Sequence, residues 1–301
     1  MAVRHREWLA GIRIIASQAG SSRRLDIVIE IPEAQTLAHQ MRDCFVGKKI
    51  LTTVAAQSPH GFAFYLGDPL SYASLLDGVT ITGAEAHGGR PELQAEDICL
   101  SFGEGVNVRM YNSEASLPKK HQLLLGFDDG RFLCCTIQMY GSMEAFLEGT
   151  NENFYYLVGK EKISVLSDEF DLAYFQSLLD DEARKGSAKA FLATQQRIPG
   201  LGNGVVQDIL WQAGIHPKAK MSNLSEADVE RLYNQVKTVL ADMTNAGGRH
   251  TEKDLYGNPG GYQVVLCKDA IGQPCPRCGT IIQRMAYLGG NVYVCEGCQK
   301  L

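Results

Sequence analysis

The sequence predicts an α+β protein built as a β-sandwich, then a helical part, then a small cysteine-stapled hairpin. Three observations lead to this prediction. Apolar β-branched runs separated by Gly and Asp-Gly turns fill residues 50–147, helical periodicity begins near Ser167, and two Cys-x-x-Cys pairs stand close to the C-terminal end. A chain of 301 residues is long enough for two domains and a sizeable core.

The predicted domain boundaries follow these changes of pattern. We expect an N-terminal extension at 1–27, a β-sandwich domain at 28–150, a helical domain at 151–262 and a cysteine-stapled hairpin at 263–301. In the extension, Arg13 interrupts a weakly apolar stretch that follows Arg4 and Arg6, so a secretory signal is not expected. Two interpretations of the extension stay open, a disordered arm and a start codon assigned too early.

The β-sandwich domain opens with two local signals. Alternation in DIVIEI (residues 26–31) predicts a short strand. Pro32 fits the first turn of a following helix, where its missing N–H costs nothing, and Glu33 is favoured by the positive end of the helix dipole. Further along, Asp129 and Gly130 in FDDGRF supply the positive φ angles of a tight hairpin turn. Several short strands at such spacing indicate an antiparallel sandwich or barrel.

The helical domain shows its periodicity in the stretches SDEFDLAYFQSLL, SAKAFLATQ, GVVQDILWQAG and SEADVERLYNQVKTVLADMTN. The last stretch has the clearest boundaries, because Ser225 and Asp228 resemble a capping box and Gly247 with Gly248 ends the helix. Its apolar residues share one face (Val229, Leu232, Val236, Val239 and Met243). We interpret Trp211 and the other aromatic residues as core.

Composition is ordinary for a soluble globular protein, with 45% hydrophobic and 21% charged residues. No apolar run is long enough to span a membrane. The net charge of −5 is uneven, since residues 1–181 carry 15 Lys/Arg and 24 Asp/Glu, whereas residues 182–301 carry 14 and 10. A surface that binds a polyanion is therefore expected in the C-terminal part.

Four of the nine cysteines form the most specific signal. Cys275 and Cys278 are separated from Cys295 and Cys298 by sixteen residues, so two Cys-x-x-Cys turns can supply a tetrahedral thiolate cage. We predict one structural Zn²⁺. Iron is one alternative, because rubredoxin-type sites use similar pairs, and four unrelated free cysteines are the other. The remaining five cysteines stand in apolar contexts, which fits reduced intracellular thiols.

A glycine-rich turn, IPGLGNG (residues 198–204), lies between two predicted helices. Such a turn can point backbone N–H groups outward at the start of the helix near Asn203, and can therefore hold a phosphate without side-chain charge. A tight helix–helix turn with no ligand is the alternative.

Together these features resemble the formamidopyrimidine-DNA glycosylase/endonuclease VIII family of base-excision repair enzymes. IPGLGNGVVQDILWQAGIHP resembles the family's helix–two-turn–helix signature, and GGRHTEKDLYGNPGGY followed by CPRCG and YVCEGCQ resembles its run into a four-Cys zinc finger. IEIPEAQTL is similar to the family's opening PELPEVET, and LPKKHQLLLGFDDGRFL to its PEKHDHVVLELDDG hairpin. The resemblance spans about residues 28–301 and implies a cleft for bent duplex DNA between the β-sandwich and the helix–two-turn–helix domain.

The resemblance also implies where the chemistry occurs. The family's terminal proline attacks C1′ of the damaged nucleotide as an amine, and the adjacent glutamate handles protons. Glu30 takes the place of that glutamate, and Ile29 takes the place of the proline with an internal peptide nitrogen instead of a free amine. Translation from Leu25 or Val28 would supply a primary amine near this place. Without the resemblance, Glu30 would be interpreted as a solvated or capping carboxylate.

Other family positions are matched unevenly. The family's DNA-contacting residues have counterparts in Asn203 of the turn, His121 of KKHQ, and the basic pair Arg184 and Lys185. Taken alone, His121 would be an ordinary strand-end histidine. The family's hairpin lysine falls at Gly89 or Arg90, its zinc-finger arginine at Gly290, and its charged DPRRFG strand at the uncharged TIQMYGS.

The resemblance implies a monomeric, intracellular base-excision repair protein that binds duplex DNA with a lesion or abasic site, with no membrane partner and with nucleoid association when bound. In this hypothesis it is a DNA glycosylase/AP lyase that uses an N-terminal amine and Glu30. The alternative is a catalytically impaired protein that binds damaged DNA, because Ile29, Gly290 and the missing hairpin lysine depart from the family. A third hypothesis is a scaffold whose affinity for DNA has faded, which the acidic N-terminal part favours.

Overall fold

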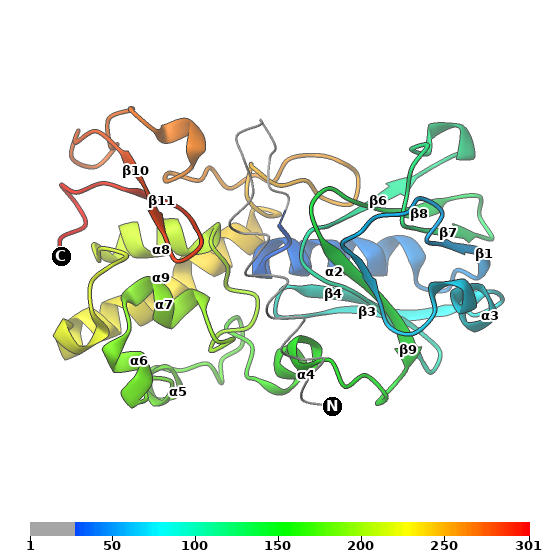
Figure 1. Cartoon of the computed structure of the whole chain (residues 1–301), viewed down its shortest axis with the longest axis horizontal. Coiled ribbons are helices and arrows are strands. Elements are labelled where there is room, and N and C mark those ends of the chain that lie inside the picture. Colours follow the sequence, from blue (N-terminus) through cyan, green and yellow to red (C-terminus); the bar gives the residue numbers. More distant parts are fainter. Residues whose placement is uncertain (1–27) are drawn as a thin grey trace.

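Two β-sheets and a group of helices lie side by side, and α2 (Ile31–Phe45) reaches from one part to the other (Figure 1). The structure, a computed structural model, describes residues 28–301. The extension predicted at 1–27 lies outside the described residues, so neither interpretation of it is tested. The α+β architecture with a C-terminal hairpin is confirmed.

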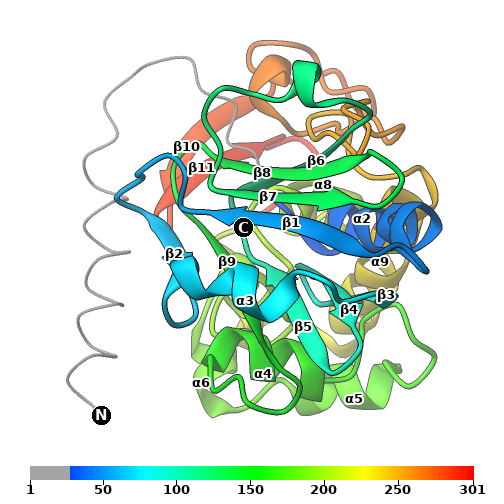
Figure 2. The ribbon, with the colours of Figure 1, turned by 90° about the vertical axis from the view of Figure 1, so that its right-hand side faces the viewer.

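A four-stranded and a five-stranded sheet form two layers, with α2 beside them (Figure 2). The first sheet, in the order β1-β7-β8-β6, contains β1 (Ile50–Ala55), β6 (Val106–Tyr111), β7 (Leu123–Phe127) and β8 (Phe132–Ile137). The second, in the order β2-β9-β5-β4-β3, contains β2 (Ala63–Tyr65), β3 (Ile81–His87), β4 (Arg90–Ala95), β5 (Ile98–Phe102) and β9 (Gly141–Leu147). The antiparallel prediction holds for the paired strands except β2 and β9, which run parallel.

The two local predictions at the start of this part have different outcomes. DIVIEI is wrong as a strand over its described residues, because residues 28–30 form no strand and the helix begins at Ile31, while Asp26 and Ile27 lie outside the described residues. Its alternation has another cause, since Ile29 packs in the β core and Ile31 in the helical core. FDDGRF is confirmed as a hairpin, with β7 and β8 antiparallel and Gly130 at φ 83°.

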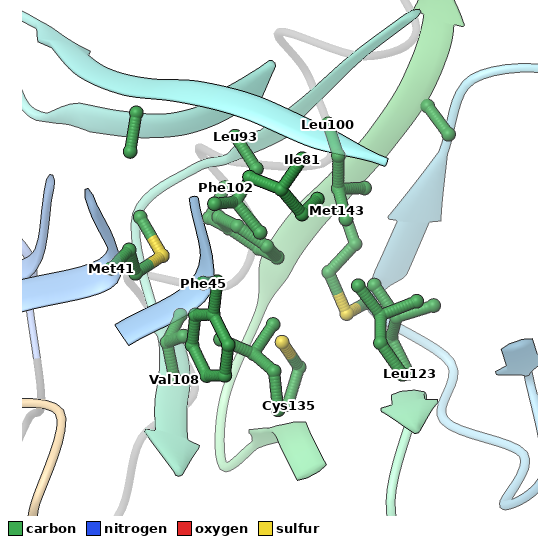
Figure 3. Close-up of a cluster of buried hydrophobic side chains, with 14 of the residues drawn as sticks. Met41, Phe45, Ile81, Leu93, Leu100, Phe102, Val108, Leu123, Cys135 and Met143 are labelled. Carbon is green, nitrogen blue, oxygen red and sulfur yellow. The ribbon is translucent and has the colours of Figure 1, made fainter. Parts of the chain in front are cut away.

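The β core lies between the two sheets and the inner face of α2 (Figure 3). Met41 and Phe45 come from α2, and Phe45 stacks on Phe127 with ring centroids 4.4 Å apart. Burying a side chain of this size stabilises the fold by roughly 1.5–3 kcal/mol. This packing fixes α2, and α2 in turn fixes the position of the residues at its N-terminal end.

The helical predictions are confirmed. This part contains α4 (Phe154–Glu161), α5 (Leu172–Ser177), α6 (Asp181–Lys185), α7 (Ala188–Ala193), α8 (Val205–Ala213) and α9 (Glu226–Asn245). The capping box of Ser225 and Asp228 starts α9, and the predicted apolar face of that helix is buried. A short helix, α3 (Tyr72–Leu76), belongs to the β part. Within residues 28–301, no helix is both long enough and apolar enough to cross a membrane.

The chain returns to the β part after α9 before it ends. Leu255, from the segment between α9 and the cysteines, is fully buried in the β core. The antiparallel hairpin of β10 (Gln283–Tyr287) and β11 (Gly290–Val294) follows and packs over α8, where Trp211 lies under the cysteines. The segment 247–262 therefore joins both parts, and the predicted domain boundaries stay a prediction.

Candidate functional site

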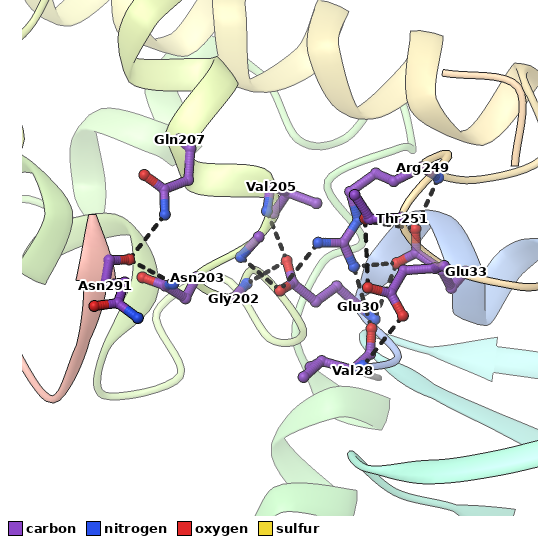
Figure 4. A network of polar contacts seen from close by, with 12 residues as sticks. Val28, Glu30, Glu33, Gly202, Asn203, Val205, Gln207, Arg249, Thr251 and Asn291 are labelled. Carbon is purple, nitrogen blue, oxygen red and sulfur yellow. Dashed lines mark hydrogen bonds and ion pairs between the residues drawn. The ribbon is translucent and has the colours of Figure 1, made fainter. Parts of the chain in front are cut away.

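The carboxylate of Glu30 lies inside the glycine-rich turn that precedes α8 (Figure 4). Its oxygens accept the backbone N–H groups of Gly202, Gly204 and Val205 at 3.2, 2.8 and 2.9 Å. A Cβ on Gly202 would lie 2.7 Å from this carboxylate, so the close approach requires glycine. The prediction that this turn offers its N–H groups to a phosphate is wrong for these three, because a side chain of the same chain already binds them.

Arg249 lies on the other side of Glu30 and holds two carboxylates together. Its Nε and Nη2 donate to the two oxygens of Glu33 at 2.9 and 2.7 Å, and its Nη1 lies 3.5 Å from Glu30 Oε1. All three side chains are buried. Burial acts to lower the pKa of Arg249, but the charges of Glu30 and Glu33 outweigh burial and raise it above its ordinary value. Arg249 therefore stays charged inside the protein.

A third buried carboxylate, Glu252, reaches the start of the described fold. Its Oε2 accepts the backbone N–H of Val28 at 3.3 Å, and Arg249 Nη2 donates to the carbonyl oxygen of Val28 at 3.1 Å. Burial raises the pKa of Glu252 from 4.5 to about 8, against the opposing charge of Arg249. We call Glu30, Glu33, Arg249 and Glu252 the buried charge cluster.

The chain after α9 brings Arg249 to this place. Gly247 and Gly248 have φ angles of 74° and 96°, which L side chains rarely adopt, and they turn the backbone toward α2. The Arg249 N–H then donates to Glu33 Oε1 at 3.0 Å. Sequence reasoning missed Arg249, Glu33 and Glu252 as site residues. The available signal was the charge in GGRHTEKD directly after a helix end, but pairing across more than 200 residues cannot be seen in one sequence.

The tip of the β3–β4 hairpin closes against the same turn. A Cβ on Gly89 would lie 3.1 Å from Gly200 Cα and 3.2 Å from the Ile29 carbonyl oxygen. Arg90 points elsewhere, with Nη2 3.0 Å from Glu144 Oε1. Neither position that matches the family's hairpin lysine therefore presents a proton donor beside Glu30.

The turn is also bonded to the C-terminal hairpin (Figure 4). The amide nitrogens of Asn203 and Gln207 donate to the carbonyl oxygen of Asn291 at 3.0 and 3.1 Å. A Cβ on Gly290 would lie 3.4 Å from the side chain of Asn203, which is tolerable contact. Asn203 is exposed and lies beside Gly290, the position that aligns with the family's zinc-finger arginine.

The other predicted DNA contacts lie apart from the turn. His121 precedes β7 and is 8% exposed, with Nδ1 3.3 Å from the carbonyl oxygen of Pro118. This is the arrangement of an ordinary strand-end histidine. Arg184 and Lys185 are both exposed in the last turn of α6. Of the predicted catalytic and DNA-contacting residues, the structure brings Glu30 and Asn203 together at the glycine-rich turn, and it leaves His121 and the Arg184–Lys185 pair in other elements.

The four predicted cysteines come together. The sulfur atoms of Cys275, Cys278, Cys295 and Cys298 all lie within 4.8 Å of one another. The Cys275–Cys298 and Cys278–Cys295 separations are 3.8 and 3.4 Å. A tetrahedral zinc ion with Zn–S bonds of about 2.3 Å requires sulfur atoms about 3.8 Å apart, so the cage fits zinc. Beside it, the Arg277 guanidinium stacks on Trp211 at 4.1 Å and ties the cage to α8.

Comparisons with known proteins agree with this geometry. A family model described as "Formamidopyrimidine-DNA glycosylase H2TH domain" matches residues 161–254, and one described as "Zinc finger found in FPG and IleRS" matches residues 272–301. The cysteine cage is therefore a structural site for one zinc ion. The formamidopyrimidine-DNA glycosylase of Enterococcus faecalis is 29% identical over 289 residues, covering 90% of this chain and 97% of its own. That of Lactobacillus delbrueckii subsp. bulgaricus is 27% identical, covering 90% and 99%.

Solved structures give the same result. The Lactococcus lactis Fpg in complex with abasic-site DNA superimposes with a TM-score of 0.77 at 25% identity, covering 90% of this chain and 100% of its own. The same enzyme with DNA containing N7-benzyl-Fapy-dG gives a TM-score of 0.78 at 25% identity.

Proposed function

Because the chain belongs to the formamidopyrimidine-DNA glycosylase/endonuclease VIII family, we propose that it binds duplex DNA with a lesion or abasic site and acts on it as a DNA glycosylase and AP lyase. The observation that carries the proposal is the bonded path from Glu30 through the glycine-rich turn to β11. This path joins the N-terminal end of α2, the helix–two-turn–helix and the zinc hairpin. A solved relative of matching fold is bound to abasic-site DNA.

Contacts with the DNA backbone come from the second half of the chain. Asn203 is exposed on the turn, and Arg184 with Lys185 adds two positive charges from α6. Phosphate contacts of this kind position the duplex and carry no base specificity. His121 is proposed as a further contact, although its ring must turn outward from Pro118 to reach a phosphate.

Burial raises the pKa of Glu30, whereas the charge of Arg249 and the N–H groups of Val205 and Gly204 act to lower it. With these partners, the role proposed for Glu30 is that of a fixed negative charge. Three backbone N–H groups and Arg249 hold both of its oxygens, so the carboxylate cannot swing toward a substrate. An imine between a protein amine and C1′ becomes positively charged when protonated, and a preorganised carboxylate beside it lowers the energy of that charge. The protein is proposed to work as an intracellular monomer, associated with the nucleoid when bound to DNA.

A second candidate function is supported by the substituted positions. Ile29 offers a peptide nitrogen, a Cβ at Gly89 would lie only 3.1 Å from the backbone of Gly200, and Gly290 lacks the guanidinium of the family's arginine. A protein with these substitutions and an intact turn would bind damaged DNA without cleaving it.

Equilibrium binding to a duplex with one abasic site, compared with the same duplex undamaged, tests the recognition that both candidates share. We expect tighter binding to the abasic duplex and an affinity that falls with salt, at a log–log slope of roughly 0.9 per phosphate contact. Equal affinity for both duplexes, or a flat salt dependence, would reject damaged-DNA recognition and leave the scaffold hypothesis.

A further inference from the structure

The segment that leads into the glycine-rich turn has an unusual backbone. Gln195 and Gln196 have φ angles of 58° and 51°, and within residues 28–301 they are the two adjacent non-glycine residues with positive φ. A residue with a Cβ is sterically disfavoured in this left-handed region, so it persists there only where the surrounding structure imposes it. Two such residues side by side, directly before Arg197 and the turn, indicate that another part of the chain holds this backbone in place.

The side chain of Lys162 makes this contact. Its Nζ donates to the carbonyl oxygens of Gln196 and Arg197 at 2.8 and 3.3 Å. Lys162 is the C-cap residue of α4, which lies between the sheets and the other helices (Figure 1). Hydrogen bonds from an ammonium group are charge-assisted and therefore stronger than those between neutral groups. One side chain thus fixes the orientation of two successive peptide groups at the entrance to the turn.

Packing alone does not hold the turn at this place. A cavity of about 120 Å³ lies beside it, with a lining that includes Ile31, His87, Lys162 and Pro199. Space that side chains leave unfilled supplies no dispersion contacts, so the position of the turn depends more on directed bonds. Lys162 provides these bonds before the turn. Within the turn, the Gly200 carbonyl oxygen accepts the N–H of Ile31 at 3.2 Å.

We infer that Lys162 is a positioning residue for DNA binding, which holds Gln196 in its left-handed conformation and thereby sets the geometry of the turn that carries Asn203. The inference rests on the proposed function, because that turn is the element proposed to contact phosphate. Glu30 fixes the far end of the turn through the N–H groups of residues 202, 204 and 205. Lys162 fixes the near end, so Asn203 lies in a segment that is held on both sides.

A direct contact between Lys162 and a DNA phosphate is the alternative role. The geometry favours positioning, because the ammonium group is half-buried and already bonded to two carbonyl oxygens of the protein. Burial and the charge of Arg197 also lower the pKa of Lys162. The two roles differ in their salt dependence. A phosphate contact contributes roughly 0.9 to the log–log slope of affinity against salt, whereas a bond to the protein backbone contributes nothing.

Lys162→Met and Lys237→Met form a matched pair of variants. Lys237, on α9, is also half-buried and donates its Nζ to a backbone carbonyl, but that carbonyl belongs to Ser167, before α5. Affinity for an abasic-site duplex is measured for each variant over a series of salt concentrations, after zinc content and urea denaturation verify that it is folded. Lys162→Met should lower the affinity about tenfold, since the left-handed conformation loses its support, with an unchanged salt slope. Lys237→Met should bind like the parent.

A second substitution separates positioning from a general loss of stability. Gln196→Gly removes the Cβ that disfavours positive φ, so in the Lys162→Met variant it should recover affinity by at least about threefold. In the parent chain, where Lys162 already holds this conformation, the same substitution should change affinity by no more than about twofold. This difference between the two backgrounds measures the coupling of Lys162 to Gln196.

The possible failures can be told apart. A salt slope that falls by roughly 0.9 in Lys162→Met would overturn the inference and make this lysine a phosphate contact, while recognition of damaged DNA stands. Equal affinity of Lys162→Met and Lys237→Met would also overturn it, as would an equal effect of Gln196→Gly in both backgrounds. If the parent chain itself binds the abasic duplex no more tightly than the undamaged one, the proposed function is rejected, and the inference with it.

Discussion

The guanidinium of Arg249 and the carboxylate of Glu33 form a bidentate ion pair, with N–O distances of 2.9 and 2.7 Å, between residues 216 positions apart. The pair fastens the segment after α9 to the first turn of α2. Because Glu30 precedes that turn and binds the glycine-rich loop, the same contact sets the geometry of the whole site. A structural ion pair and the proposed chemistry therefore depend on the same residues.

Removing Arg249 should destabilise the fold strongly. Arg249→Met leaves the buried carboxylates of Glu30 and Glu33 without a cation, and we expect the free energy of unfolding to fall by about 3–5 kcal/mol. Arg231→Met is the control, since Arg231 pairs with Asp228 at the surface and exposed pairs contribute at most about 1 kcal/mol. Urea denaturation of both variants measures the difference. An equal fall in the free energy of unfolding for both variants would show that the buried ion pair stabilises the fold no more than the exposed one.

Stability should depend on pH through Glu252. Its pKa is raised by burial from 4.5 to about 8 in the folded protein, so between these values the folded state holds a proton that the unfolded chain releases. The free energy of unfolding should therefore fall as pH rises through this range. Denaturation at several pH values should show a shallower slope for Glu252→Gln than for the parent chain. A slope unchanged by the substitution would contradict this assignment.

Zinc content should follow the cysteine cage. Cys295→Ser removes a fully buried ligand, and we expect metal analysis to fall from one zinc per chain to nearly none. The β10–β11 hairpin should then lose its anchor, with loss of duplex binding. Cys134→Ser, a buried cysteine of the β part, should keep its zinc. Iron in the purified parent protein would mean that the cage holds the other metal.

Asn203 should contribute equally to all duplexes. Asn203→Ala removes a group proposed to contact phosphate, so affinity should drop about tenfold for damaged and undamaged DNA alike. Asn234→Ala, exposed on α9, is the control and should leave affinity unchanged. A loss confined to the abasic duplex would mean that Asn203 reads the lesion instead.

Gly290 offers a gain-of-function test at the same surface. A side chain there has room beside Asn203, so Gly290→Arg should strengthen duplex binding and steepen the log–log salt slope by roughly 0.9. Gly290→Glu changes the same position to the opposite charge and should weaken binding. If both variants bind the duplex with the parent's affinity and salt dependence, this face of the β10–β11 hairpin does not contact the DNA.

The fold was largely predictable because its signals are local. The capping box at Ser225 and Asp228, the Asp-Gly turn at Gly130 and the spacing of the four cysteines each depend on a few neighbouring residues. DIVIEI failed because alternation in this segment serves two different cores, and nothing in the local pattern distinguishes that from a strand.

The site was only partly predictable, because its contacts join distant segments. Glu30 could be identified by resemblance, but its bonds to Gly204 and Val205 span more than 170 residues. The turn looked free to bind phosphate because a single sequence does not show which side chain will occupy its N–H groups. Arg249 and Glu252 were missed for the same reason.

Strand cleavage at a single abasic site tests the central claim most directly. The protein is incubated with an end-labelled duplex that carries the abasic site and, separately, with the same duplex undamaged, and the products are separated on a denaturing gel. We predict cleavage at the abasic site and an intact strand in the undamaged duplex. An intact abasic strand, under conditions where the protein binds the duplex, would contradict the proposed AP lyase activity and leave a repair-enzyme fold that recognises damage without acting on it.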